Sequence, residues 1–402
     1  MTDAAHATTS PSRGASILGR IAALGFGLIL AFALIEIAGR IALGFEPLPG
    51  WARDFYSRVG YELRPHDSYI YASRDGEFEN EVRTNARGLH DVEHTLDKPA
   101  GVFRILILSD SYGQAREVPI EANFARRLEA HLNEGAPAGT VFEVINAGQF
   151  GLGTTQEYLY YTVEGRRYDP DLVLVGFYVG NDVVDNHAPL IQAWNGVAEV
   201  DFPYFSPDGT LHQPGMAIGR RILSWLRQNT TLGYLAARAM GESGDAERVE
   251  VGDADAVSAD ALRVPMGVYL PPDAIWEDAW AVTAHAFAEL KRVVEADGAR
   301  LGVFVIPDRR QVYDEDWAAT LDRLPDLAAA ALDRKRPTNT VLALLAAQDI
   351  PALSLLEPFR AAADRLYFPG DGHFTPAGHA LTAQTLAGWL QDAGLIPEEA
   401  AP

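Results

Sequence analysis

The sequence predicts an α/β protein with a parallel sheet, preceded by a membrane-spanning helix. Apolar runs such as Phe103–Leu108 lack the polar alternation of half-exposed strands, which favours strands buried on both faces. These runs alternate with helical patterns, and that order implies parallel strands joined by right-handed crossovers. The uncharged stretch Ile21–Ile35 with its borders spans about 20 residues, which is the length that a bilayer requires.

The N-terminal region divides into a tail and an apolar segment. Residues 1–16 are small, polar and aperiodic, which predicts a disordered tail. Residues 17–43 predict a membrane anchor. Its apolar stretch is bordered by Arg20 and Arg40, although Glu36 near one end is unfavourable in a bilayer. A cleaved signal peptide and a buried soluble helix are the alternatives; the long leader and the lack of a clear cleavage site speak against the signal peptide. The arginines do not fix the orientation, and we expect the bulk of the chain outside the cytoplasm, in the periplasm or at the cell surface.

The rest of the chain is expected to form an extension and one larger domain. Residues 44–100 predict a stalk and an N-terminal extension, with short strands at 69–71 and 81–83. From Gly101 strand and helix patterns alternate, so residues 101–396 are expected to share one core. The predicted strands are 103–108, 141–145, 171–179, 301–306 and 352–356, and the predicted helices are 121–133, 154–165, 276–297, 317–345 (interrupted by Pro325 and Pro337) and 376–393.

Residues 188–270 interrupt the alternation. They begin with several prolines, continue with a helical pattern over 222–240 and end in the acidic stretch 242–260. We predict a lid-like insertion that contains a disordered loop. An ordinary surface excursion is the alternative.

The composition excludes several classes of function. Acidic residues outnumber basic ones by 55 to 33, so a nucleic-acid partner is not expected, because phosphate binding needs clustered cations. The chain has no cysteine, which excludes disulfides, thiolate metal sites and a cysteine nucleophile. It also lacks a Walker loop, a zinc-protease helix motif and a Gly-x-Ser-x-Gly elbow, and we expect neither a cofactor nor a metal.

The candidate chemistry begins with Ser111, which follows the first strand of the main domain. Ligands of open α/β sheets bind at the carboxyl ends of the strands. A serine hydroxyl becomes nucleophilic when a base removes its proton, and histidine suits that task because its pKa lies near neutrality. The oxyanion that forms on the substrate also needs hydrogen-bond donors already in place.

These groups follow other strand ends or precede the last helix. A glycine-rich segment, Asn146–Gly153, follows the second strand and can present backbone N–H groups. Gly180-Asn181-Asp182 follows the third strand and supplies an amide side chain. Asp371-Gly-His373 precedes the last helix and supplies an imidazole beside a carboxylate. We therefore expect these residues to gather with Ser111 at one edge of the sheet.

These four stretches resemble the sequence blocks of the SGNH/GDSL hydrolase superfamily, in the family's order across residues 101–393. The resemblance implies a three-layer α/β/α sandwich with a flavodoxin-like parallel sheet. It implies Ser111 as nucleophile and His373 as base, with the oxyanion held by the N–H groups of Ser111 and Gly151 and by the amide of Asn181. A membrane-anchored branch, with a leading helix and a segment like Thr84–Gly88 before the first block, is the best match.

The sequence departs from the family pattern in two places. Ser109 stands where the family usually has glycine, and it is expected to crowd the turn. The orienting aspartate usually stands three residues before the histidine, where this chain has Gly370, whereas Asp371 stands two before. Either Asp371 or a backbone carbonyl is expected to orient His373. A second histidine, His379, is expected to be structural.

The resemblance implies a serine esterase that acts through an acyl-enzyme. The expected substrates are O-acyl esters, for example O-acetyl groups, on extracytoplasmic glycans, and the superfamily and the anchor alone suggest them. Three alternatives stay open: an O-acyltransferase in polysaccharide modification, a lipid esterase, and a catalytically inactive membrane-tethered scaffold. The sequence does not indicate the oligomeric state.

Overall fold

A computed structural model describes residues 13–43, 46–214, 218–239, 248–252 and 258–397. The chain divides into two compact units. The smaller unit contains residues 1–48 and 216–244, and the larger unit contains residues 49–215 and 245–402. The predicted tail lies outside the described residues up to residue 12.

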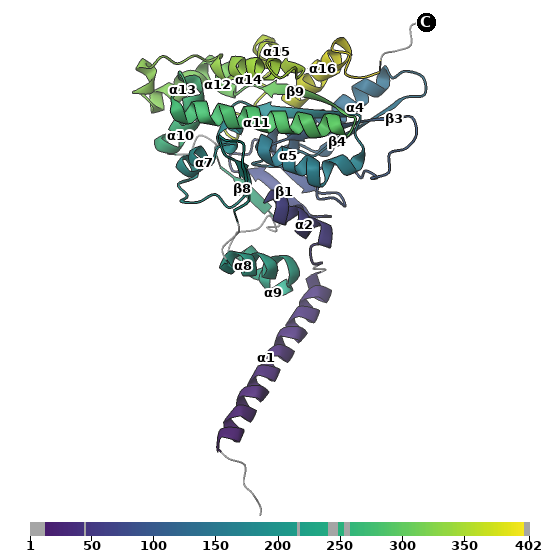
Figure 1. The fold of residues 1–402 in the computed structure, drawn as a ribbon, viewed down its shortest axis with the longest axis vertical. Coiled ribbons are helices and arrows are strands. Elements are labelled where there is room, and N and C mark those ends of the chain that lie inside the picture. The colour runs from purple at the N-terminus through teal and green to yellow at the C-terminus, as the bar shows by residue number, and fades with distance from the viewer. Residues whose placement is uncertain (1–12, 44–45, 215–217, 240–247, 253–257, 398–402) are drawn as a thin grey trace, which may run out of the picture. The chain divides into compact units, whose positions relative to one another are not determined.

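The larger unit is built on a five-stranded parallel sheet (Figure 1). The strand order is β10-β9-β5-β3-β4, which is the flavodoxin-like order with a switch point between β3 and β5. All five predicted strands are confirmed, with small differences at their ends. They are β3 (Val102–Ser109), β4 (Val141–Asn146), β5 (Leu172–Tyr178), β9 (Arg300–Ile306) and β10 (Ala352–Ser354).

Helices cover both faces of this sheet, as the predicted three-layer sandwich requires. Strand residues alternate between two apolar clusters, so that Leu106 and Leu108 enter one core and Ile105 and Ile107 enter the other. On the first face lie α5 (Thr154–Val163), α11 (Ala274–Ala296) and α14 (Arg336–Ala346). On the second face lie α4 (Phe124–Glu134), α15 (Leu356–Ala361) and α16 (Pro376–Asp392).

The predicted helix 317–345 is two helices. The first, α13 (Asp314–Arg323), ends before Pro325, because proline removes a backbone donor and clashes with the preceding turn. A short 3₁₀ segment follows, and α14 then begins at Arg336 with Pro337 in its first turn. Pro337 therefore starts a helix and does not interrupt one, since the first turn has no partner for the missing N–H.

The N-terminal extension is more ordered than a stalk. α2 (Gly50–Val59) was not predicted; its Phe55 packs edge-on against Tyr160 of α5, with ring centroids 5.4 Å apart. The two predicted short strands are confirmed as β1 (Ser68–Ser73) and β2 (Glu79–Arg83), which pair antiparallel.

The predicted disordered loop is wrong for residues 248–251. Arg248–Val251 forms β8, which pairs parallel to β1. Val249 and Val251 alternate with charged residues and pack on a small cluster around Tyr71, so burial of one face holds this strand in place. The other acidic residues at 242–247 and 253–257 lie outside the described part of the chain.

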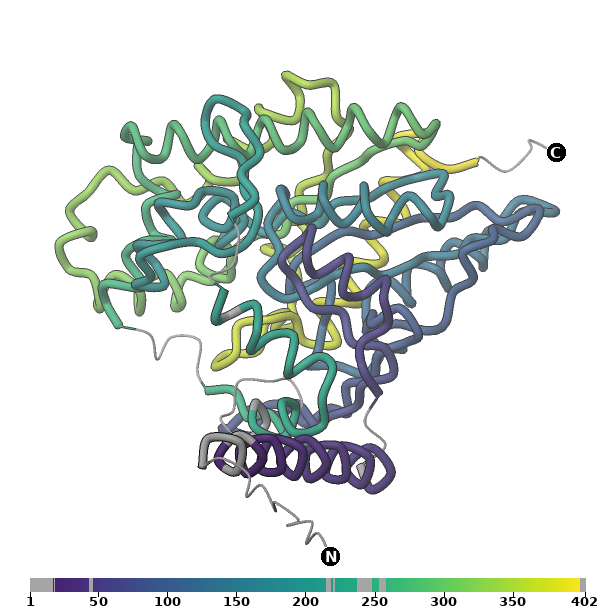
Figure 2. The backbone as a smooth tube through the Cα atoms, turned by 60° about the horizontal axis from the view of Figure 1, so that its bottom comes forward, coloured from purple at the N-terminus to yellow at the C-terminus, as the bar shows by residue number. Residues whose placement is uncertain are grey.

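The remainder of the predicted insertion 188–270 contributes to both units. In the larger unit it forms α7 (Ala188–Asn195), a hairpin of β6 (Tyr204–Phe205) and β7 (Leu211–His212), and α10 (Ala259–Met266). In the smaller unit it forms α8 (Ile218–Asn229) and α9 (Thr231–Ala239), where one helix over 222–240 was predicted. In Figure 2 these two helices lie beside α1, and α9 contacts α1.

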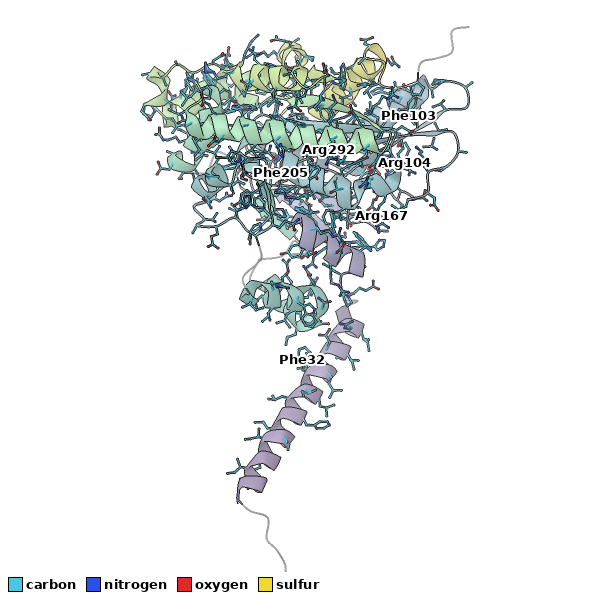
Figure 3. The ribbon with its side chains drawn as sticks, viewed as in Figure 1. Phe32, Phe103, Arg104, Arg167, Phe205 and Arg292 are labelled. Atoms are coloured by element: carbon cyan, nitrogen blue, oxygen red, sulfur yellow. The ribbon has the colours of Figure 1, made fainter. Side chains whose placement is uncertain are left out.

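The smaller unit contains the predicted membrane segment. α1 (Arg13–Leu43) begins earlier than expected, because each residue added to an existing helix gains a hydrogen bond at little cost. Its stretch Gly19–Ala42 is long and apolar enough to cross a membrane, by length and composition. Side chains along it, Phe32 among them, project away from the helix (Figure 3).

Candidate active site

The candidate nucleophile lies at the switch point of the sheet. β3 ends at Ser109, and Ser111 begins the one-turn helix α3 (Ser111–Gln114). Asp110 caps this helix, because its carboxylate accepts the Tyr112 N–H at 2.9 Å. The side chain of Ser111 is therefore held at the carboxyl end of β3, as predicted.

Ser109 is accommodated by two glycines. Its hydroxyl donates to the Gly176 carbonyl on β5 at 3.0 Å. A Cβ on Gly176 would lie 2.8 Å from the Ser109 Oγ, and one on Gly113 would lie 2.6 Å from the Ser109 Cβ. The expected crowding at Ser109 is therefore relieved, because Gly113 and Gly176 have no side chain and leave room for the serine.

His373 contacts both Ser111 and Asp371. Its Nε2 lies 2.8 Å from the Ser111 Oγ, and its Nδ1 lies 2.7 Å from the Asp371 Oδ1. The same carboxylate oxygen accepts the His373 backbone N–H at 3.1 Å. Of the two orienting groups left open by the sequence, the structure therefore shows Asp371. Asp371 can reach the imidazole from only two residues before it because Gly372 has a φ of +89°, a left-handed conformation that glycine adopts readily.

The histidine loop is held by groups outside the motif. The Glu77 carboxylate accepts the N–H groups of Gly370 and Asp371 at 2.8 and 2.9 Å. The hydroxyl of Tyr112, next to the candidate nucleophile, donates to the Gly372 carbonyl at 2.8 Å. These bonds connect the loop to the N-terminal extension and to α3.

Glu117 is a site residue that the sequence analysis missed. Its Oε1 lies 3.4 Å from the His373 Nδ1, and its Oε2 is buried without a hydrogen-bond partner in the described part of the chain. Burial alone would lower the pKa of His373, but the charges of Glu117 and Asp371 outweigh it and raise that pKa to about 9. No motif signals Glu117, because it comes from an irregular segment that only the tertiary fold brings to the imidazole.

The two predicted oxyanion donors face the same cavity as Ser111. Gly151 has a φ of +73°, and no atom lies within 4 Å of the place that a Cβ would take. The Asn181 Nδ2 donates to the Asp185 Oδ2 at 2.7 Å, which fixes the orientation of the amide. Burial raises the pKa of Asp185 to about 8, so this carboxyl is largely neutral at pH 7. The amide nitrogen keeps a second proton for another acceptor.

All five predicted site residues line one cavity of about 470 Å³. Ser111, Asp371 and His373 are hydrogen-bonded in a row, whereas Gly151 and Asn181 are placed by the loops after β4 and β5. The predicted insertion contributes an apolar wall to this cavity. That wall is formed by Ile191, Trp194, Phe202, Leu262 and Pro265.

Two other features bear on the chemistry. Glu117, Asp371 and His373 each place a donor atom within 4.8 Å of the others, a spacing that can hold a metal ion. The buried His379 accepts the Phe124 N–H at 3.3 Å and stacks on the Phe124 ring. Burial lowers the pKa of His379 to about 3, so it stays neutral and structural, as expected.

One family model matches the C-terminal part of the chain. Residues 270–401 match the family model described as the SGNH hydrolase-like domain of the acetyltransferase AlgX. No curated protein matches the chain by sequence.

Solved structures are similar at low sequence identity. A two-domain esterase (CEX) active on acetylated mannans is 12% identical, with 75% of this chain and 52% of that chain covered and a TM-score of 0.39. The chain thus spans about half the length of that esterase. The acetyl xylan esterase AlAXEase is 12% identical, with 71% and 98% covered and a TM-score of 0.36. A lipase/acylhydrolase from Enterococcus faecalis is 13% identical, with 74% and 100% covered and a TM-score of 0.37.

Proposed function

We propose that the chain is a serine enzyme of the SGNH/GDSL hydrolase superfamily that cleaves O-acyl esters on glycans outside the cytoplasm. The observation that carries the proposal is the 2.8 Å hydrogen bond between the His373 Nε2 and the Ser111 Oγ. This bond joins a nucleophile to a base in the wall of a cavity. Two carboxylates, Asp371 and Glu117, lie on the other side of the same imidazole.

The proposed reaction has two halves. The Ser111 Oγ attacks the ester carbonyl carbon while its proton passes to the His373 Nε2. The Asn181 amide and the N–H groups of Ser111 and Gly151 stabilise the oxyanion of the tetrahedral intermediate. The intermediate collapses as the imidazolium returns the proton to the leaving alcohol, and an acyl-serine remains. Water, deprotonated by the same imidazole, then releases the acid and regenerates the serine.

The carboxylates beside the imidazole fit this cycle. Each half passes through an imidazolium, which a negative charge at 2.7–3.4 Å from the Nδ1 stabilises. Burial raises the pKa of Asp371, but its contacts with His373 outweigh burial and keep that pKa below the usual value. Asp371 therefore stays ionised at neutral pH, as an orienting group requires.

The size of the cavity supports a substrate with a bulky alcohol part. An acetyl group has three heavy atoms and fills only a small part of about 470 Å³. The rest of the cavity is therefore available to a sugar-sized alcohol or to a longer acyl chain. The indole of Trp194 and the ring of Phe202 offer the flat apolar surfaces on which sugar rings stack.

An O-acyltransferase is the second candidate, and the family model favours it because its description names an acetyltransferase. The same residues serve both reactions, and only the acceptor of the acyl group differs. The apolar wall likewise suits a lipid ester, which would place an acyl chain against Ile191 and Leu262.

Acid release from acetylated glycans, with and without an unacetylated acceptor glycan, tests the proposal. We expect wild type to release acetate without acceptor and Ser111→Ala to release none. Ser57→Ala, a change on the exposed surface, is the matched control. Transfer that requires the acceptor would assign the acyltransferase, and no turnover of any ester by wild type would contradict both.

For the location, we propose that α1 anchors the chain in a membrane with the larger unit outside the cytoplasm. We call this larger unit the catalytic unit, because it contains Ser111 and His373. Its length and apolar composition support the anchor. Protease digestion of intact spheroplasts tests the orientation, since an external catalytic unit is degraded there and a cytoplasmic one is protected.

A further inference from the structure

The smaller unit carries an exposed apolar surface outside α1. α8 is amphipathic, because its apolar side chains gather on one side of the helix and its polar ones on the other. A group of large apolar side chains that are exposed to water usually marks an interaction surface. The exposed fractions on α8 are 73% for Ile218, 53% for Ile222, 65% for Leu223 and 57% for Trp225. On α9, Leu232 is 46% exposed and Leu235 is 39% exposed.

The charge of this segment is opposite to that of the chain. The protein has a net charge of −22 and 55 acidic residues, yet residues 209–241 contain no aspartate or glutamate. The two helices carry four arginines, at 220, 221, 227 and 238. In α8, Arg221 and Arg227 fall among the polar residues and not on the Trp/Leu/Ile side, which is the pattern of helices that lie in a membrane interface. Anionic headgroups complement the arginines.

The hairpin of α8 and α9 is fixed to α1 near the C-terminal end of its apolar stretch. The Glu36 carboxylate accepts the Thr231 N–H at 2.8 Å, and Arg40 donates to the Asn229 carbonyl at 2.9 Å. The helices approach closely here, since a Cβ on Gly39 would lie 2.4 Å from the Thr231 Cγ2. These contacts also explain Glu36, the unfavourable acidic residue of the predicted anchor, because it caps α9.

This attachment sets the depth of the hairpin. The apolar stretch ends at Ala42, so the level of Glu36–Arg40 is the level at which a spanning α1 leaves the hydrocarbon. A helix fixed there lies among the headgroups, where tryptophan is enriched. Burial of four large side chains of α8 in that layer would remove them from water.

We propose that the α8–α9 hairpin is a membrane-interface element that lies beside α1, with its apolar side in the acyl–headgroup boundary and its arginines among anionic headgroups. The partner is a bilayer that contains anionic lipid. The chain then meets the membrane twice along its sequence, once at α1 and once between the two halves of the catalytic unit. The proposal uses the spanning role of α1 and is independent of the chemistry at Ser111.

Fluorescence of single labels in the full chain tests this proposal directly. The chain has no cysteine, so Ile222→Cys and Trp225→Cys each give one site for an environment-sensitive NBD label. Ser224→Cys, on the polar side of the same turn, is the matched control, and Phe32→Cys reports insertion of α1. The labelled proteins are reconstituted in vesicles of phosphatidylcholine with and without about one quarter phosphatidylglycerol, and lipids that carry a shallow nitroxide or aqueous dithionite serve as quenchers.

We expect the labels at 222 and 225 to be blue-shifted, quenched at least about twofold by the shallow nitroxide, and protected from dithionite, most strongly with phosphatidylglycerol. The label at 224 should react with dithionite, and the label at 32 should be quenched by a deep nitroxide. Labels at 222 and 225 that dithionite reaches as fast as the one at 224 would overturn the proposal. So would labels protected from both quenchers, which would mean that protein, a second copy or the catalytic unit, covers this surface.

Discussion

Replacing Glu117 by glutamine should move the pH dependence of the enzyme toward lower pH. The change removes one negative charge 3.4 Å from the His373 Nδ1 and keeps the shape of the side chain. That charge favours the imidazolium, so its loss lowers the pKa of His373 from its value of about 9. The base is active when neutral, and the neutral form should therefore appear at lower pH in the variant.

The structure sets the magnitude. Coulomb's law at 3.4 Å with an effective dielectric constant of about 20 gives about 5 kcal/mol, which is an upper bound. Opposite charges within about 4–6 Å commonly move a pKa by about 1–3, and we expect Glu117→Gln to lower the pKa of His373 by about 1 or more. At pH 7 only about 1% of a base with a pKa near 9 is neutral, so each decrease of the pKa by about one raises the neutral fraction about tenfold.

The assay is the second-order rate of Ser111 phosphonylation by a fluorophosphonate between pH 6 and 10, which needs no knowledge of the substrate. The rate of wild type should rise with pH with a midpoint near pH 9, and that of Glu117→Gln should have its midpoint at lower pH and reach a lower plateau. The control is Glu121→Gln, an exposed change of the same charge, which should leave the midpoint in place. A midpoint in Glu117→Gln that coincides with wild type would show that the Glu117 carboxylate does not raise the pKa of His373.

Other changes have defined consequences. Asn181→Ala should lower kcat for ester cleavage by about 10²–10³, since it removes one oxyanion donor, and an unchanged kcat would exclude the amide from that role. Gly176→Ala should destabilise the fold by about 1–3 kcal/mol in urea unfolding, because the new methyl group would lie 2.6 Å from the Phe304 ring and 2.8 Å from the Ser109 Oγ; Gly135→Ala, with open space around it, is the control. Chelation with EDTA should leave the phosphonylation rate unchanged, and a loss that zinc restores would instead assign the carboxylates beside the imidazole to a metal.

The sheet could be predicted because its strands are buried on both faces. Such strands read as apolar runs without polar alternation, and Ile105–Leu108 is the clearest of them. Polar motifs that directly follow these strands must lie at one sheet edge, which is why Ser111 and Asn181 could be placed in one cavity. His373 could be placed with them because its motif enters the last helix.

What the sequence did not predict depends on contacts between distant segments. β8 forms because its valines meet β1, far earlier in the chain. The break between α8 and α9 is stabilised by Glu36, which caps Thr231 from 195 residues away. Glu117 reaches the imidazole of His373 in the same way, from a segment without regular structure. The hydrophobic pattern and motifs of a short segment do not indicate which distant residues it will contact.

Mass spectrometry of the full chain after reaction with a fluorophosphonate tests directly whether Ser111 is a nucleophile activated by His373. We expect one adduct on the peptide that contains Ser111, no adduct in Ser111→Ala, and labelling at least about 10²-fold slower in His373→Ala, because the serine loses its base. An adduct that forms at the wild-type rate in Ser111→Ala would show that another residue is the nucleophile, and equally fast labelling of Ser111 in His373→Ala would show that His373 is not its base.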